Sequence, residues 1–333
     1  MKGKITVKST KNHLFFASMT KPHILQVAKF SPYLTEKLHQ AFTVHDRVHE
    51  SDPAAFAAIK DKIEAIAGGG ESKVPASLIA QLPALRMVSI FGVGYDGVDV
   101  PAAIAHGAKV THTPNVLNDE VADLALALML AVARNIVQAD QHVRSEAWLN
   151  GPLPLGRKMS GARLGIVGMG RIGQTIARRA QAFDMAVTYT ARSAKPNLPY
   201  SYVSSVEALA AQVDFLVVIT PGGAATRKMI NAQVLKALGP QGYLINVARG
   251  SVVDEQALIT ALENGDIAGA GLDVFEAEPS VPEALRKNPK VVLTPHIGSA
   301  TTQTRNAMAD LAFDNLALHF AGKPLRTPVP ECA

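Results

Sequence analysis

The sequence predicts an α/β protein in which helices wrap doubly wound parallel sheets. Short β-rich runs alternate with helix-like runs from Pro22 onward, and this alternation occurs in two successive series. A glycine-rich turn joins a strand to a helix at the start of the second series. The chain has 333 residues, and a domain has about 150, so we expect about two domains.

The first series alternates strands and helices up to about residue 113. Pro53, Pro75 and Pro101 lie where first helical turns would begin, a position that tolerates the missing N–H of proline. In chain order we expect strand 23–28, helix 33–41, strand 43–46, helix 54–59, strand 63–67, helix 76–82, strand 85–91, helix 102–105 and strand 109–113.

A long helix from Asn118 to about Ser145 is expected between the two series, with Asn118 or Asp119 as its N-cap. It is apolar almost all round between Val121 and Ala133, so it either lies between the two lobes or supports a subunit interface. After a Gly/Pro-rich connector we expect strand 163–167, helix 171–183, strand 186–190, helix 206–211, strand 215–220, helix 232–238, strand 243–247, helix 255–262, strand 267–273, strand 291–294 and a last helix from 301 to about 320.

Composition excludes several classes of protein. Hydrophobic residues make up 48% of the chain and charged residues 18%, which is typical of a globular protein. The single cysteine, Cys332, allows no intrachain disulfide and no cysteine-rich zinc site, and it favours a reducing, cytoplasmic location. No apolar stretch is long enough for a membrane helix, and we expect no metal site.

The net charge of +5 is concentrated at the N-terminus. The first 18 residues carry four lysines and no acid, so 5 − 4 leaves +1 for residues 19–333, and nucleic-acid binding is not indicated. Residues 1–19 are expected to form a flexible leader, or translation starts at Met19; a transit peptide is a lesser alternative. The apolar patch from Leu14 to Met19 is too short for a secretory signal.

Gly168, Gly170 and Gly173 form a G-x-G-x-x-G fingerprint directly after one expected strand and before a helix. In this context Gly168 permits the tight turn, Gly170 lets the backbone approach a pyrophosphate, and Gly173 lets the helix pack on the strand. The N–H groups at the start of the helix attract phosphate. We therefore predict a dinucleotide site here.

The end of the next strand reads Tyr-Thr-Ala-Arg-Ser over residues 189–193, without the acid that would bind the ribose 2′-hydroxyl of NAD. Arg192 can bind a 2′-phosphate bidentately, and Ser193 can donate to it. The sequence therefore favours NADP(H), with NAD(H) possible. The alternative is that Arg192 is an ordinary surface arginine.

A second glycine cluster, FGVGYDGVD over residues 91–99, lacks this context, because its helix starts only near Pro101. The N–H groups of Val93 and Gly94 lie at a strand end, where they could hold a small carboxylate. A plain tight turn explains the cluster equally well.

Three later segments place charged residues after strands, at the edge that lines the cofactor site in such sheets. Hydride transfer to a 2-oxo acid requires a cation, a proton donor and a group that tunes the donor. Arg249, His296 and Glu278 supply these chemistries. His296 alone would be more simply explained as structural, since the chain has 10 histidines.

The segments NVARGSVVDEQALITAL, GAGLDVFEAEP and LTPHIGSAT, together with GMGRIG, resemble the D-isomer-specific 2-hydroxyacid dehydrogenase family from Pro22 onward. The resemblance implies that Arg249 binds substrate, that His296 is the acid/base, and that Glu278 pairs with it and keeps it protonated to higher pH. It also places Asp273 by the nicotinamide carboxamide and a substrate carboxylate on Val93 and Gly94.

The same resemblance implies a discontinuous domain arrangement and a set of further contacts. Residues 119–299 would form a Rossmann-type dinucleotide-binding domain inserted into a flavodoxin-like substrate domain, residues 20–118 plus 300–333, and a homodimer would form through the cofactor domain. Trp148 would either reach the neighbouring subunit's active site or pack in a dimer arm. Further expected cofactor contacts are Arg171, Ile172, Thr220, Pro221, Thr226, Val247, Ala248 and Gly298, with Ser299 at the substrate.

Within the family, the strand end at Arg192 resembles the NADPH-using glyoxylate/hydroxypyruvate reductases, which implies reduction of these acids to glycolate and D-glycerate. Phosphoglycerate dehydrogenases usually have arginine where this chain has Ile90, so that activity is disfavoured. Two alternatives stay open: a reductase of a bulkier acid such as a phenylpyruvate, and a dinucleotide-sensing scaffold similar to transcriptional corepressors. The chain lacks the long disordered extensions expected of the scaffold.

Overall fold

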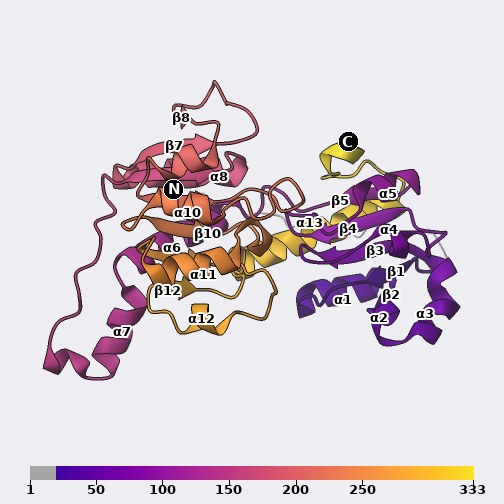
Figure 1. Ribbon diagram of the computed structural model, residues 1–333. Coiled ribbons are helices and arrows are strands. Elements are labelled where there is room, and N and C mark those ends of the chain that lie inside the picture. Colours follow the sequence, from indigo (N-terminus) through magenta and orange to yellow (C-terminus); the bar gives the residue numbers. More distant parts are fainter. Residues whose placement is uncertain (1–19) are drawn as a thin grey trace, which may run out of the picture. The chain divides into compact units, whose positions relative to one another are not determined.

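A computed structural model describes residues 20–333 of the chain (Figure 1). It divides into two compact units: a first unit of residues up to Thr113 together with Met308–Ala333, and a second unit of Pro114–Ala307. Within each unit the named strands pair in parallel, as the alternating pattern predicted. The expected leader, residues 1–19, lies outside the described residues, and the domain limits expected from the sequence stay a prediction.

The first unit contains a five-stranded sheet in the order β2-β1-β3-β4-β5, the order of flavodoxin-like folds. Its elements are β1 (His23–Gln26), α1 (Pro32–Ala41), β2 (Thr43–Asp46), α2 (Val48–Ser51), α3 (Pro53–Ile59), η1 (Lys60–Lys62), β3 (Ile63–Gly69), α4 (Ala76–Ile79), β4 (Met87–Phe91), α5 (Val100–Ala105), β5 (Lys109–Thr111) and η5 (Pro330–Cys332), with most of α13 (Thr302–Phe320).

Three helices of the first unit, α1, α3 and α5, begin after a side chain that caps the N-terminus. Ser31, Asp52 and Asp99 accept hydrogen bonds from the N–H groups of the first turns of α1, α3 and α5, and each helix has proline in that turn. Successive strand residues point to opposite faces of the sheet. Accordingly, Ile24 packs in a core with α1 and α13, whereas Leu25 packs in a core with α3, α4 and α5.

The second unit contains a seven-stranded sheet in the order β12-β11-β10-β9-β6-β7-β8, a doubly wound order that reverses between β6 and β9. Its elements are α6 (Asn118–Ala133), α7 (Ile136–Arg144), η2 (Ala147–Asn150), β6 (Arg163–Val167), α8 (Arg171–Ala180), η3 (Gln181–Phe183), β7 (Ala186–Thr190), β8 (Ser201–Tyr202), α9 (Val206–Ala210), β9 (Phe215–Val218), α10 (Ala232–Leu238), β10 (Tyr243–Asn246), η4 (Gly250–Val252), α11 (Glu255–Asn264), β11 (Gly269–Leu272), α12 (Glu283–Arg286) and β12 (Val291–Leu293).

Small residues on β11 allow the helices of the second unit to approach the sheet closely. A Cβ atom on Gly271 would lie 3.0 Å from the Cβ of Leu128 on α6. Ala270 and Leu272, which alternate with Gly271, belong instead to the core formed with α9, α10 and α11. Helices therefore cover both faces of this sheet, as the predicted doubly wound class requires (Figure 1).

The single long helix expected from Asn118 to about Ser145 is wrong in its extent. The structure has two helices, because Asn135 adopts a left-handed backbone (φ 51°) between α6 and α7. The expected cap is also wrong, since Leu117 precedes α6 and no side chain caps it. α6 is buried along most of its length, as expected from its apolar composition. Among residues 20–333, no helix combines the length and apolar character needed to cross a membrane.

Candidate active site

The glycine turn after β6 fits a dinucleotide. Gly168 has a φ of 107°, and a Cβ there would lie 2.6 Å from the carbonyl oxygen of Ile219, while a Cβ on Gly173 would overlap the carbonyl oxygen of Gly168. These two glycines are required by the protein's own packing. Gly170 is not: its Cβ would meet no described atom within 4 Å. Gly170 is the N-cap of α8, and no side chain accepts a hydrogen bond from the first N–H groups of the helix. The helix that begins with Arg171 and Ile172 can therefore offer these N–H groups to a phosphate.

The turn after β7 is held in place by two tyrosines. The hydroxyl of Tyr189, whose side chain is buried, accepts a hydrogen bond from the Lys195 N–H at 2.6 Å. The hydroxyl of Tyr202 donates to the carbonyl oxygen of Ala191 at 3.4 Å. Arg192 and Ser193 are exposed on this turn, and Arg192 forms no ion pair with any described residue. Its guanidinium is therefore available to an anion.

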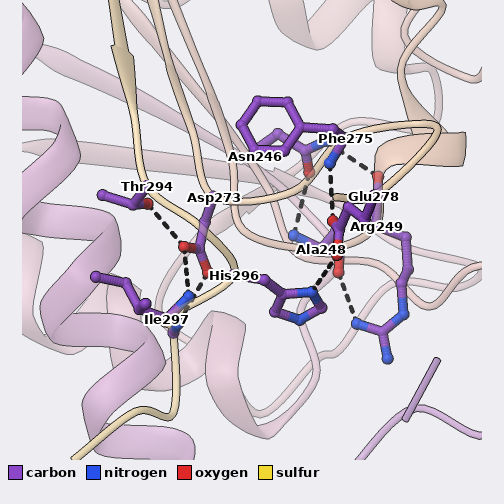
Figure 2. Close-up of polar contacts among 10 residues, drawn as sticks. Asn246, Ala248, Arg249, Asp273, Phe275, Glu278, Thr294, His296 and Ile297 are labelled. Atoms are coloured by element: carbon purple, nitrogen blue, oxygen red, sulfur yellow. Dashed lines mark hydrogen bonds and ion pairs between the residues drawn. The ribbon is translucent and has the colours of Figure 1, made fainter. Parts of the chain in front are cut away.

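Three neighbouring strands bring the charged residues together in the second unit (Figure 2). Arg249 follows β10, Asp273 follows β11 and His296 follows β12. Because carboxyl ends of parallel strands meet at one edge of a sheet, these side chains converge although Arg249 and His296 lie 47 positions apart in the chain (296 − 249). Convergence of Arg249, Glu278 and His296 was expected from the sequence, and the structure shows it.

Glu278 and His296 form a hydrogen-bonded pair. His296 Nδ1 lies 2.8 Å from Glu278 Oε2, and the other carboxylate oxygen accepts from the Phe275 N–H at 2.9 Å (Figure 2). A carboxylate can only accept, so Nδ1 carries a proton, and Nε2 is the ring nitrogen that does not contact Glu278. The side chains of His296 and Glu278 are 34% and 24% exposed. The pair is therefore partly screened from water but still accessible.

Burial by itself would raise the pKa of Glu278. Two hydrogen bonds, from His296 and from the Phe275 N–H, lower the pKa, and so do the positive charges of His296 and Arg249. Together they outweigh the effect of burial, so the pKa of Glu278 is lowered. In Figure 2 the guanidinium of Arg249 donates to the Ala248 carbonyl oxygen at 2.8 Å. Glu278 is thus ionised at neutral pH, where it can stabilise a cation on His296.

Asp273 holds the loop that carries His296. Its buried carboxylate, 2% exposed, accepts hydrogen bonds from Thr294 Oγ1 at 2.7 Å, Ile297 N at 2.8 Å and Gly298 N at 2.9 Å. Its carbonyl oxygen accepts from His296 N at 2.9 Å. These bonds flank a histidine whose φ of 52° is uncommon for a residue other than glycine. Burial raises the pKa of Asp273 even though all three carboxylate hydrogen bonds lower it.

The turn before Arg249 is fixed by Asn246 and by Gly250. The buried Asn246 amide donates to the Arg249 carbonyl oxygen at 3.0 Å and accepts from Ala248 N at 3.1 Å. A Cβ on Gly250 would overlap the backbone of Phe275, so this turn packs directly on the segment that leads to Glu278. Reasoning from the sequence missed Asn246 and Gly250 as parts of the site, although both lie within the NVARG motif.

The Val93–Gly94 turn follows β4 in the first unit. Its Gly92 carbonyl oxygen accepts from Thr113 N at 2.8 Å, and its Val93 carbonyl oxygen lies 2.8 Å from His112 Nδ1. Within residues 20–333, neither the Val93 N–H nor the Gly94 N–H has a hydrogen-bond acceptor. The turn can therefore offer two N–H groups to an anion.

The other predicted site residues lie in the second unit. Thr220 and Pro221 follow β9, and Thr226 Oγ1 donates to the Pro221 carbonyl oxygen at 2.7 Å. Val247 and Ala248 are buried after β10, and Ser299 follows Gly298 in the loop after β12. Trp148 lies on η2, far from Arg249, Glu278 and His296 in the sequence, and is 66% exposed.

Two further features of the second unit concern charge. Reasoning from the sequence missed Arg305 near the start of α13, where burial lowers the pKa and the charge of Asp273 opposes that effect. No motif distinguishes Arg305 from other arginines.

Among residues 20–333, no group of three or more histidine, cysteine or carboxylate side chains is arranged to hold a metal ion.

Comparison with known proteins identifies relatives across almost the whole chain. Residues 126–298 match the model of the D-isomer specific 2-hydroxyacid dehydrogenase, NAD binding domain. Hydroxyphenylpyruvate reductase of Plectranthus scutellarioides is 47% identical over 307 residues, which cover 92% of this chain and 98% of that protein. Glyoxylate/hydroxypyruvate reductase A of Arabidopsis thaliana is 44% identical over 307 residues, with the same coverage.

Solved structures agree with this relationship. The NADPH-dependent glyoxylate/hydroxypyruvate reductase of Sinorhizobium meliloti, in complex with NADP and malonate, matches with a TM-score of 0.89 and 47% identity over 94% of this chain and 98% of that one. A 2-hydroxyacid dehydrogenase from Ketogulonicigenium vulgare matches with a TM-score of 0.86, 46% identity, and coverage of 93% and 99%. The chain therefore belongs to the D-isomer-specific 2-hydroxyacid dehydrogenase family.

Proposed function

We propose that this protein reduces small 2-oxo acids with NADPH, with glyoxylate and hydroxypyruvate as its main substrates and glycolate and D-glycerate as products. The observation that carries the proposal is the 2.8 Å pair of His296 and Glu278 at the strand edge shared with Arg249. It places a proton donor beside a fixed cation, as reduction of a carbonyl requires. The reductases from Arabidopsis and Sinorhizobium support the choice of substrates.

The second unit would hold the cofactor. Gly168, Gly170 and Gly173 would receive the pyrophosphate, and Arg192 with Ser193 would bind the 2′-phosphate, which favours NADP(H) over NAD(H). The remaining contacts would come from Arg171, Ile172, Thr220, Pro221, Thr226, Val247, Ala248, Asp273 and Gly298. When bound, the nicotinamide supplies the hydride that reaches the C2 carbonyl carbon.

The chain's own residues would bind the acid and deliver the proton. Arg249 holds the 2-oxo acid through its carboxylate and carbonyl, and the Val93 and Gly94 N–H groups bind the carboxylate. His296 protonates the carbonyl oxygen through Nε2, while Glu278 stabilises the imidazolium. Ser299 would contact the substrate as well.

We further propose that the two units are a substrate domain and an inserted dinucleotide-binding domain, and that the protein is a cytoplasmic homodimer. Large apolar side chains are exposed along α7 and the segment after it: Trp148 is 66% exposed and Leu155 is 99% exposed. Burial of such a surface in a second copy would stabilise a dimer. Light scattering tests this, because Leu149→Glu with Leu155→Glu is expected to convert a dimer into a monomer.

The decisive experiment for the activity is NADPH oxidation on addition of glyoxylate or hydroxypyruvate. His296→Ala is expected to abolish the reaction, and His39→Ala, at an exposed position on α1, is the matched control. An unchanged rate in His296→Ala would refute the assignment.

The alternative substrate is a bulkier 2-oxo acid, as the name of the Plectranthus relative suggests. A higher kcat/KM for hydroxyphenylpyruvate than for glyoxylate would establish that alternative.

A further inference from the structure

The proposed reaction assigns no role to His112, a buried histidine of the first unit. We propose that His112 is a positioning residue that aims the Val93–Gly94 turn at the substrate carboxylate, and that the C-terminal segment 326–332 holds His112 in place. The inference rests on the proposed function, because it assumes that this turn binds the carboxylate of the acid.

His112 fixes one peptide plane of the turn. Its side chain is buried, and Nδ1 lies 2.8 Å from the Val93 carbonyl oxygen, which can only accept, so Nδ1 carries the proton. The Val93 carbonyl shares its peptide plane with the Gly94 N–H, and the two groups of a trans peptide point in opposite directions. His112 therefore turns the Gly94 N–H away from itself.

Thr113 fixes the preceding plane in the same way. Its N–H donates to the Gly92 carbonyl oxygen at 2.8 Å, and that carbonyl shares a peptide plane with the Val93 N–H. Both carbonyls thus face the 112–113 segment and both N–H groups face away from it. Two successive N–H groups that face the same way can bind one anion together. Residues 112–113 orient both donors of the turn.

The C-terminal segment holds His112 through the His112 backbone. Thr327 Oγ1 donates to the His112 carbonyl oxygen at 2.6 Å, and His112 N–H donates to the Thr327 carbonyl oxygen at 3.2 Å. The fully buried Asn315 fixes Thr327, since its side chain donates to Thr327 Oγ1 at 2.8 Å and accepts from Thr327 N at 3.2 Å.

Tyr95 joins the turn to the same segment. Its ring meets the His112 ring edge-on, with centroids 5.2 Å apart, and its hydroxyl donates to the Glu331 carboxylate at 3.1 Å. The turn is therefore braced from β5 and from the C-terminal segment at once. A brace of this kind keeps the two donors preorganised, so that binding the acid does not require the turn to be ordered.

The test compares His112→Phe with His112→Asn. Phenylalanine removes the donor, whereas the asparagine amide can donate from a position close to that of Nδ1. His106→Phe is the matched control, because His106 Nε2 makes a similar 2.9 Å contact with the Leu82 carbonyl oxygen in the same unit. Each variant is assayed for the KM of glyoxylate, the KM of NADPH and kcat, and its folding is checked by circular dichroism.

We expect His112→Phe to raise the KM of glyoxylate about tenfold, the effect of losing one well-placed hydrogen bond, with little change in the KM of NADPH. His112→Asn should restore most of the affinity, and His106→Phe should leave it unchanged. A folded His112→Phe with the wild-type KM, or an equal rise in His106→Phe, would overturn the inference. If His112→Phe does not fold, Thr327→Val should raise the KM in the same direction, and an unchanged KM there would overturn it.

Calorimetric binding of oxalate separates this inference from the proposed function. If the wild type reduces no 2-oxo acid but binds oxalate, and His112→Phe binds it more weakly, the proposed function fails and the role of His112 stands. If the wild type reduces glyoxylate and both proteins bind oxalate equally, the proposed function stands and the role of His112 fails. A wild type that neither binds oxalate nor reduces glyoxylate contradicts both.

Discussion

Replacement of Glu278 by glutamine is the sharpest test of the catalytic pair. Glutamine keeps the shape of the side chain and one oxygen that can accept from Phe275 N, but it removes the negative charge beside His296 Nδ1. Reduction requires a protonated His296, and the carboxylate favours that form. The variant should therefore lose its reductase activity at a lower pH than the wild type as pH rises.

The size of this shift follows from the geometry. A hydrogen bond to a charged group contributes about 1.5 to 3 kcal/mol, so the protonated form of His296 should lose stabilisation of this order in the variant. Because 34% of the His296 side chain and 24% of the Glu278 side chain are exposed, solvent screening favours the lower end. We expect the alkaline limb to move to lower pH, because the carboxylate that favours the imidazolium is lost.

The assay is kcat/KM for glyoxylate with saturating NADPH, measured across the range in which imidazole titrates. Glu276→Gln is the matched control, because Glu276 lies two residues away on the same loop and pairs with Arg227 at 3.3 Å instead of His296. Superimposable alkaline limbs for the wild type and Glu278→Gln would refute the role of the carboxylate. An equal shift in Glu276→Gln would show that only the general charge of the loop matters.

Four further substitutions test the cofactor and substrate contacts. Arg192→Ala should raise the KM of NADPH about tenfold or more and leave that of NADH nearly unchanged, since only the 2′-phosphate is lost; an equal loss for both cofactors would mean that the phosphate is bound elsewhere. Gly173→Ala should lower the free energy of unfolding by about 1 to 3 kcal/mol in urea titrations, because its Cβ overlaps a backbone oxygen. Gly170→Ala, whose Cβ enters open space, should instead preserve stability and weaken NADPH binding, and identical behaviour of the two glycine variants would contradict the assigned turn. Arg249→Gln should reduce kcat/KM for glyoxylate about a hundredfold, and a wild-type value would exclude Arg249 from the transition state.

Much of the fold was predictable because the strands and helices of a doubly wound sheet carry their pattern locally. The expected ranges of β6, β7 and α10 agree residue for residue with the structure. The pattern failed where a single residue decides the backbone: Asn135 ends α6 by a left-handed turn, although the apolar and helical character of the sequence continues beyond it. The short elements β8 and α12 were also missed, because two or four residues carry no periodicity.

The chemistry of the site was predictable, but its internal contacts were not. Arg249, Glu278 and His296 could be selected because charged residues after parallel strands meet at one edge. The hydrogen bonds from Asp273 to the loop after β12 join residues more than 20 positions apart, and no local pattern encodes them. The position of Arg305 near Asp273 likewise depends on where α13 begins in the second unit.

The packing of Gly250 against the Phe275 backbone has a consequence for exchanging parts between relatives. Gly250 ties segment 246–250 to segment 273–278, and Asp273 and Glu278 tie the latter to segment 294–298. Segment 273–278 thus contacts both of the others, so none of the three is expected to fit when it is exchanged alone. Chimeras should remain active only when all three are exchanged as a set, and new substrate ranges should be sought by varying residues outside that set.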